Sequence, residues 1–193
     1  MEAKKYFIID FDSTFVKSEG LEELARTALK NNPKKNQIYE KIKAITNLGL
    51  EGKLSFEKSL SQRLKLFRGT KKDVQTVAHL FKRKVTNSIK HNKQFFKTYK
   101  DSIYIVSGGF KEFIIPVMKA FRIPNSNIFA NTFIFDRTEN IVGYDRKNPL
   151  AQDNGKYNAV RLLDLKGEIY IIGDGYTDYQ IKQLGAAKYF IAF

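Results

Sequence analysis

Short apolar runs that end in small polar residues recur along the chain and predict the strands of an open sheet. Lys5–Ile9 is followed by Asp-Phe-Asp-Ser-Thr, Ser102–Val106 by Ser-Gly-Gly, and Glu168–Ile172 by Gly-Asp-Gly. A last run, Lys188–Ala192, is predicted as a further strand. Such short β-prone runs are typical of buried strands. Because ligands collect at the carboxyl ends of strands in open α/β sheets, we expect a site where these runs end.

Helical periodicity dominates the rest of the chain. About 85 residues separate the first motif from the second strand, far more than the usual connection of about 4–6 residues. The helices expected there are Leu21–Leu29, Lys34–Leu48, Phe56–Phe67, Lys71–Val85 and Asn87–Tyr99. Further helices are expected at Phe110–Phe121, Tyr157–Leu165 and Thr177–Leu184, and a β-hairpin at Ala130–Tyr144.

These elements predict an α/β fold with a Rossmann-like parallel-sheet core in three layers. Residues 1–15 and 86–193 are expected to form the core, and residues 16–85 a small helical cap inserted after the first strand. The length of 193 residues and the 42% hydrophobic content suit one core with such a cap. The chain has no cysteine, which excludes disulfides and thiol catalysis. No run is long enough to span a bilayer and no signal-peptide pattern is present, so we expect a cytoplasmic protein.

Charge is the feature that favours a different function. The formal net charge is +14, and Lys71–Lys100 contains nine Lys or Arg against one acid. Interleaved aromatic residues could complete a nucleic-acid surface. However, their spacing is one that a helix would bury, so a nucleic-acid-binding or non-catalytic module is kept as a minor alternative. A general attraction of anionic phosphate esters is a sufficient use for the charge.

Four polar motifs occur along the chain, and their order is more informative than any one of them alone. Asp10 and Asp12 bracket Phe11, Ser107-Gly108-Gly109 follows, then Lys156 at a helix start, then Gly-Asp-Gly-Tyr-Thr-Asp with Asp174 and Asp178. Each motif alone is common, as an acidic turn, a loop, a solvated lysine or a turn signal. In this order they resemble the haloacid dehalogenase superfamily, and within it the phosphoserine phosphatase family. The stretches Glu19–Ala25 and Glu51–Phe56 narrow the resemblance to the family.

The resemblance implies roles for the acids. Asp10 is the expected nucleophile, forming an aspartyl-phosphate, and Asp12 the acid that protonates the leaving oxygen and then the base for water. Because a phosphate monoester carries nearly two negative charges, a carboxylate can approach only beside a cation. Mg²⁺ prefers oxygen ligands, here the Asp10 and Asp174 carboxylates and the Asp12 carbonyl, with Asp178 ligating it or holding its waters.

Further residues are expected to bind the substrate. Ser107 and the N–H groups of Gly108 and Gly109, at the start of the predicted helix, would bind phosphate together with Lys156.

The family positions for the ammonium and carboxylate of phosphoserine are occupied by Glu19 and Arg63, and Phe56 would pack on the substrate methylene. Each also has a purely structural interpretation: Glu19 as an acid in the first turn of a helix, Arg63 as a solvated helix residue, and Phe56 as part of the core. Thr177 stands where the family has an asparagine, which removes an amide near the phosphate.

We therefore expect a Mg²⁺-dependent phosphomonoesterase that hydrolyses O-phosphoserine in serine biosynthesis. The first alternative is a phosphatase or phosphotransferase acting on another small phosphorylated metabolite. Family members usually continue beyond the last predicted strand, so the chain is expected to be either a minimal version or one domain of a longer polypeptide with a fused partner.

Overall fold

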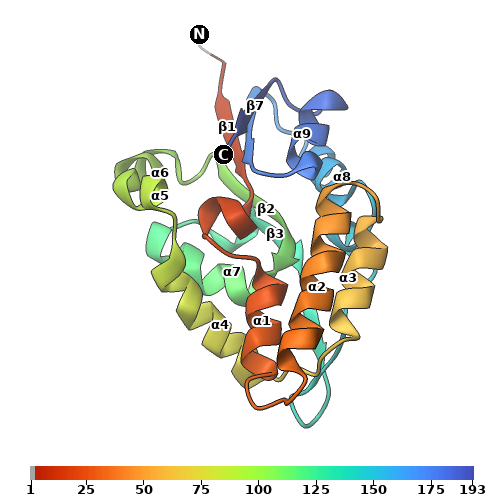
Figure 1. The fold of residues 1–193 in the computed structure, drawn as a ribbon. Coiled ribbons are helices and arrows are strands. Elements are labelled where there is room, and N and C mark those ends of the chain that lie inside the picture. Colours follow the sequence, from red (N-terminus) through yellow and green to blue (C-terminus); the bar gives the residue numbers. More distant parts are fainter. Residues whose placement is uncertain (1–2) are drawn as a thin grey trace.

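The computed structural model describes residues 3–193 (Figure 1). Five parallel strands form the central sheet in the order β3-β2-β1-β6-β7. The strands are β1 (Lys5–Ile9), β2 (Ile103–Phe110), β3 (Ile128–Asn131), β6 (Glu168–Gly173) and β7 (Tyr189–Ala192). Because β1 is the middle strand, the residue that follows it lies at the centre of the carboxyl edge of the sheet.

Helices cover both faces of this sheet. Successive residues of a strand point to opposite faces, and Ile8 and Ile9 of β1 accordingly belong to two different hydrophobic clusters. The cluster around Ile8 includes residues of α8 (Gly155–Leu162) and α9 (Tyr176–Gln183). The larger cluster around Ile9 includes residues of the helices that precede β2 and of α7 (Lys111–Met118). The predicted α/β fold with a parallel central sheet is therefore confirmed.

A short irregular helical segment, Phe11–Phe15, follows β1, and six α-helices then connect it to β2. They are α1 (Gly20–Ala28), α2 (Lys35–Leu50), α3 (Phe56–Leu64), α4 (Lys71–Lys84), α5 (Asn87–His91) and α6 (Lys93–Tyr99). Figure 1 shows α1, α2 and α3 side by side beyond the carboxyl ends of the strands. Leu24, Ile42 and Leu60, one from each of these helices, are buried in the same cluster as Ile9. These helices therefore share a core with the sheet, and the cap boundary at residues 16 and 85 stays a prediction.

The two chain segments that lead into and out of these helices lie against each other. Val16 and Val85 form an antiparallel bridge. The Lys17 N–H donates to the Lys84 carbonyl (2.9 Å), and the Thr86 N–H donates to the Phe15 carbonyl (3.0 Å). The chain therefore leaves and re-enters the sheet region at one point.

The predicted hairpin is confirmed, and the strand before it was missed. β4 (Phe133–Phe135) and β5 (Ile141–Tyr144) pair antiparallel. β3 pairs with β2 immediately upstream, although the prediction merged part of this strand with the hairpin. The Phe133 ring stacks on Phe110 of β2 with ring centroids 3.6 Å apart, which ties the hairpin to the core.

Two predicted helices differ from the structure. The single helix Asn87–Tyr99 is wrong, because the chain forms α5 and α6 with a break at Asn92. The Asn92 side chain donates to the Ser88 carbonyl (2.8 Å), and asparagine often competes in this way with helical bonding. The helix expected from Phe110 begins at Lys111, since β2 continues through the two glycines.

Three single-turn helices lie elsewhere in the described chain. They are Lys119–Phe121, Asn125–Asn127 and Pro149–Ala151. Among the described residues, no helix is both long enough and apolar enough to cross a membrane.

Candidate active site

A pocket of about 100 Å³ opens at the carboxyl edge of the sheet. Every residue that the sequence predicted for the site lines it, namely Asp10, Asp12, Glu19, Phe56, Arg63, Ser107, Gly108, Gly109, Lys156, Asp174, Thr177 and Asp178. Other lining residues are Gly20, Leu21, Thr46, Gly49, Ser59, Gly175 and Tyr176. The volume is well below the roughly 300–1,000 Å³ of common ligand pockets, so the pocket suits a small molecule.

Asp10 stands at the end of the central strand and is held from several sides. Its N–H continues the sheet by donating to the Ile172 carbonyl of β6 (2.9 Å). Its Oδ1 accepts the N–H of Phe11 (2.7 Å), and its Oδ2 lies 2.8 Å from the Lys156 Nζ. These bonds fix the carboxylate at the pocket wall, where it is 7% exposed.

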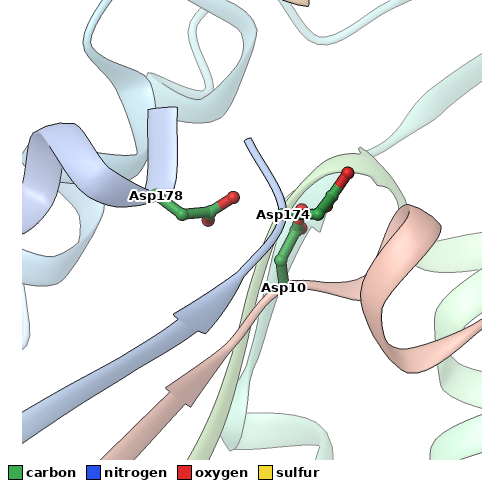
Figure 2. Close-up of side chains that lie close together, drawn as sticks. All are labelled: Asp10, Asp174 and Asp178. Carbon is green, nitrogen blue, oxygen red and sulfur yellow. The ribbon is translucent and has the colours of Figure 1, made fainter. Parts of the chain in front are cut away.

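Three carboxylates gather beside this position (Figure 2). Each of Asp10, Asp174 and Asp178 offers an oxygen, and these oxygens lie within 4.8 Å of one another. Asp10 and Asp174 follow β1 and β6, and Asp178 faces them from the first turn of α9. Such a set of oxygen donors fits a hard divalent cation such as Mg²⁺.

Lys156 provides the positive charge nearest to these acids. It is the second residue of α8, and its Nζ lies 2.8 Å from both the Asp10 Oδ2 and the Asp178 Oδ1. Burial alone would lower its pKa, but the two carboxylates hold the pKa above its ordinary value. Lys156 therefore carries a full positive charge. Burial raises the pKa of Asp178 to about 7, although the neighbouring Lys156 ammonium acts to lower it.

Asp12 occupies a space that a glycine leaves open. Its Oδ1 accepts the N–H of Gly20 (2.9 Å). A Cβ on Gly109 would lie 2.6 Å from its Oδ2, closer than two such atoms can approach. Burial, together with the charges of Glu19 and Asp10, raises the pKa of Asp12 well above its usual value. The carboxyl is therefore held firmly in place and retains a proton more readily than an exposed aspartate.

The segment Ser107–Gly109 is also packed closely. The Ser107 Oγ accepts the N–H of Gly109 (2.9 Å), so that N–H bonds within the segment. A Cβ on Gly108 would lie 2.7 Å from Cζ of Phe56. The aromatic ring of α3 therefore covers the end of β2, and both glycines are needed for close approach by neighbouring side chains.

Glu19 points into the pocket just before α1. Its Oε1 accepts the hydroxyl of Ser13 (2.5 Å). Ser13 has φ of 53°, in the left-handed region that non-glycine residues seldom adopt. Burial raises the pKa of Glu19, and no lysine or arginine lies within ion-pair distance of it in the described chain.

Arg63 brings a positive charge into the same pocket from α3. It is 7% exposed, and burial lowers its pKa. Its bonds are long ones, from Nε to the Ser59 carbonyl (3.3 Å) and from a terminal nitrogen to the Thr46 hydroxyl (3.4 Å). Within residues 3–193 it forms no ion pair. Because a buried unpaired charge is costly, this guanidinium is suited to an incoming anion.

Two hydroxyl residues that contact acids of the pocket were not assigned roles from the sequence. Thr14 donates to Asp174 Oδ1 (2.9 Å), and Ser13 holds Glu19 as described above. Both directly follow Asp10 and Asp12 in the sequence, and this position was the signal that could have marked them as site residues. Thr14 and Asp174 lie 160 positions apart, so their contact could not be predicted from the sequence.

Comparison with known proteins places the chain in a family. A family model described as haloacid dehalogenase-like hydrolase matches residues 7–181. The chain therefore belongs to the haloacid dehalogenase-like hydrolases, as the order of its motifs predicted.

Named relatives narrow the likeness further. The phosphoserine phosphatase of Arabidopsis thaliana, a chloroplast protein by its name, is 30% identical over 95% of this chain. This chain spans 61% of that relative's length. A phosphoserine phosphohydrolase-like protein from Francisella tularensis has a crystal structure with a TM-score of 0.86 and 34% identity, covering 98% of this chain and 87% of that one. A substrate-bound phosphoserine phosphatase complex has a TM-score of 0.76 and 27% identity, covering 100% and 87%.

Proposed function

We propose that the protein is a Mg²⁺-dependent phosphomonoesterase that hydrolyses O-phosphoserine. The observation that carries this proposal is a pair of opposite charges in the pocket, Glu19 and Arg63, neither of which forms an ion pair among the described residues. Arg63 is a buried cation and Glu19 a half-buried anion, and both line the pocket beside Asp10. Phosphoserine carries a carboxylate and an ammonium besides its phosphate, so each end group meets a charge of opposite sign. The named relatives support the same substrate.

The acid cluster is proposed to hold Mg²⁺. Asp10, Asp174 and Asp178 supply the carboxylate oxygens, and the resemblance adds the Asp12 carbonyl. Bound there, the ion would neutralise phosphate charge and lower the barrier to attack by a carboxylate. Thr14 would keep Asp174 turned toward the ion through its hydroxyl.

Asp10 is proposed as the nucleophile. One of its carboxylate oxygens attacks phosphorus, so an O–P bond to Asp10 forms as the bond to the serine oxygen breaks. Asp12 gives its proton to that leaving oxygen. A water molecule then attacks the aspartyl-phosphate and passes a proton to Asp12, which releases phosphate and restores both acids. The fixed positions of the two carboxyl groups serve this sequence because neither must move far.

Phosphate is proposed to bind between α8 and the end of β2. The Lys156 ammonium, already 2.8 Å from Asp10, would contact a phosphoryl oxygen on that carboxylate. The Ser107 hydroxyl and the Gly108 N–H are the neighbouring donors, while the Gly109 N–H helps to orient Ser107. Charge-assisted bonds of this kind strengthen as charge develops in the transition state.

Residues 16–85 are proposed to act as a helical cap over the substrate. Phe56 of this segment lies against Gly108, so the aromatic ring already covers the proposed phosphate site. Closure would exclude bulk water and strengthen each charge contact inside. Thr177, on the first turn of α9, is proposed to contribute a hydroxyl at the edge of the site.

Phosphate release tests the proposal directly. We expect Mg²⁺-dependent release from O-phospho-L-serine that exceeds release from phosphothreonine and from an aryl phosphate, and that stops with EDTA or in Asp10→Asn. Release from the aryl phosphate alone would be consistent with Asp10 as the nucleophile but would contradict O-phosphoserine as the substrate. Transfer of the group to added alcohols, rather than to water, would indicate a phosphotransferase. No release from any substrate would contradict the proposed enzyme.

A further inference from the structure

Lys84 joins the two chain segments that lead into and out of the helices α1 to α4. It is the last residue of α4, and its carbonyl accepts the Lys17 N–H (2.9 Å). Its ammonium donates to the Ser18 Oγ (3.0 Å) and to the Glu23 Oε1 (2.7 Å). Neither the sequence motifs nor the proposed mechanism assigns this lysine a role.

The two partners of this ammonium lie on either side of Glu19. Ser18 directly precedes Glu19, and Glu23 follows it by one helical turn. The Glu23 N–H donates to the Glu19 carbonyl (3.1 Å), which forms the first turn of α1. All four residues line one hollow, and Glu19 lines the active-site pocket as well. Lys84 therefore binds the residues before and after the carboxylate that is proposed to bind the substrate ammonium.

The polar turn that carries Glu19 has weaker restraints than the rest of α1. The apolar side of the helix is fixed by burial, as at Leu24. At the start of the helix, however, the Glu19 side chain accepts no N–H of the first turn, although such caps commonly stabilise helices. The Ser13 N–H reaches the Ser18 carbonyl only over 3.4 Å, longer than most bonds of this kind. The contacts of Lys84 are the shorter ones at this turn.

We propose that Lys84 is a positioning residue for substrate selection, which holds Glu19 where its carboxylate can pair with the substrate ammonium. This inference rests on the proposed phosphoserine activity. Lys84 acts through Ser18 and Glu23 and does not itself contact the substrate. Because the attraction between two charges falls with their separation, a displaced Glu19 would discriminate less between substrates with and without an ammonium.

The test is the ratio of kcat/KM for O-phospho-L-serine to that for phospholactate, which carries a hydroxyl in place of the ammonium. We expect this ratio to fall about 10-fold in Lys84→Met, since a displacement of about 1 Å can cost up to 10²-fold. Glu23→Ala should lower the ratio similarly, and the double variant no further, because both changes remove one contact. Lys84→Arg should retain most of the ratio. Melting temperature should change little, since partly exposed ion pairs contribute little to stability.

Lys17→Met is the matched control. The Lys17 Nζ donates to the Asn87 Oδ1 (3.1 Å), so this lysine also joins the two connecting segments, but its ammonium bonds neither Ser18 nor Glu23. The variant removes the same charge and is expected to leave the ratio unchanged. Loss of charge alone would weaken turnover of the more anionic phospholactate more, and so would raise the ratio rather than lower it.

An unchanged ratio in folded Lys84→Met, or an equal fall in Lys17→Met, would overturn the inference. Amide hydrogen exchange at Gly20 and Glu23 provides a readout that needs no turnover. We expect faster exchange of these two N–H groups in Lys84→Met only, and exchange at the wild-type rate would also overturn the role of Lys84. A wild-type ratio near one would instead contradict the proposed phosphoserine activity, and the exchange rates would still decide whether Lys84 holds the turn that carries Glu19.

Discussion

At the scale of single residues, two glycines determine where the Asp12 carboxyl and the Phe56 ring can lie. Gly109 leaves the space that the Asp12 Oδ2 occupies, and Gly108 leaves the space for the Phe56 ring. From the sequence, both were assigned only to backbone approach toward phosphate. The structure adds that their missing side chains also admit parts of the proposed catalytic apparatus. This requirement depends on residues distant in the chain, so it was not evident from the motif itself.

Gly109→Ala is expected to reduce turnover about 100-fold with little change in melting temperature. The added Cβ would displace the Asp12 carboxyl, and a shift of about 1 Å in a reacting group can cost 10²-fold. Steady-state phosphate release and thermal unfolding measure the two effects. Gly143→Ala is the matched control, since a Cβ there meets nothing within 4 Å. Equal activity of both variants would show that Asp12 does not need this space.

Thr14→Val is expected to raise the Mg²⁺ concentration for half-maximal activity about 10-fold. Valine keeps the shape of threonine but lacks the hydroxyl that donates to Asp174 (2.9 Å), and partners of metal ligands commonly contribute 10–100-fold to affinity. Activity measured across a Mg²⁺ titration checks this, and saturating Mg²⁺ should restore most of the turnover. An unchanged Mg²⁺ requirement would contradict a contribution of Thr14 to Mg²⁺ binding.

At the scale of elements, Glu112 joins α7 to the hairpin, but burial of its carboxylate lowers the stability of the fold. The Glu112 Oε1 accepts the N–H of Phe133 (3.0 Å), which anchors the start of β4. Its Oε2 is buried and has no partner among the described residues. Burial raises the pKa of Glu112. The hydrogen bond favours the fold, whereas the ionised, partly desolvated carboxylate opposes it.

This opposition predicts a pH dependence of stability. Because the pKa of Glu112 is raised in the folded protein, the Glu112 carboxyl loses its proton at a lower pH in the unfolded chain than in the folded one. As pH rises from the unfolded to the folded pKa, the contribution of Glu112 to the free energy of unfolding therefore falls. Glu112→Gln keeps the acceptor and removes the charge. Its unfolding free energy relative to wild type is therefore expected to be greater near about pH 7 than near about pH 4. Denaturant titrations at both pH values measure this, with exposed Glu40→Gln as the control. A difference independent of pH would contradict the explanation.

The elements themselves were predicted well where periodicity and length agreed. β1, the hairpin and the helices α1 to α4 fall close to their predicted positions. β3 was missed because its four residues run directly into the hairpin. The break at Asn92 was missed because apolar periodicity continues across it, and only a side-chain bond to Ser88 marks the interruption.

At the scale of the whole molecule, the site is assembled from parts of the chain far apart in sequence. The ends of β1 and β6 supply Asp10 and Asp174, and α9 supplies Asp178. Lys156 comes from α8 and Arg63 from α3. The sequence predicted these residues from motif order and family resemblance. It did not predict that Arg63 would be buried without an ion pair in residues 3–193, because that depends on how α3 packs over the sheet.

We propose that the charges of Glu19 and Arg63, beside the proposed nucleophile Asp10, select phosphoserine. The most direct measurement is the ratio of kcat/KM for O-phospho-L-serine to that for phosphoethanolamine, which lacks only the carboxylate, in wild type and in Arg63→Gln. Losing a charge-assisted contact predicts that the ratio falls about 10- to 100-fold in the variant, with phosphoethanolamine turnover nearly unchanged. Melting temperature verifies that the variant is folded. An unchanged ratio in a folded Arg63→Gln protein would contradict the assignment of the substrate.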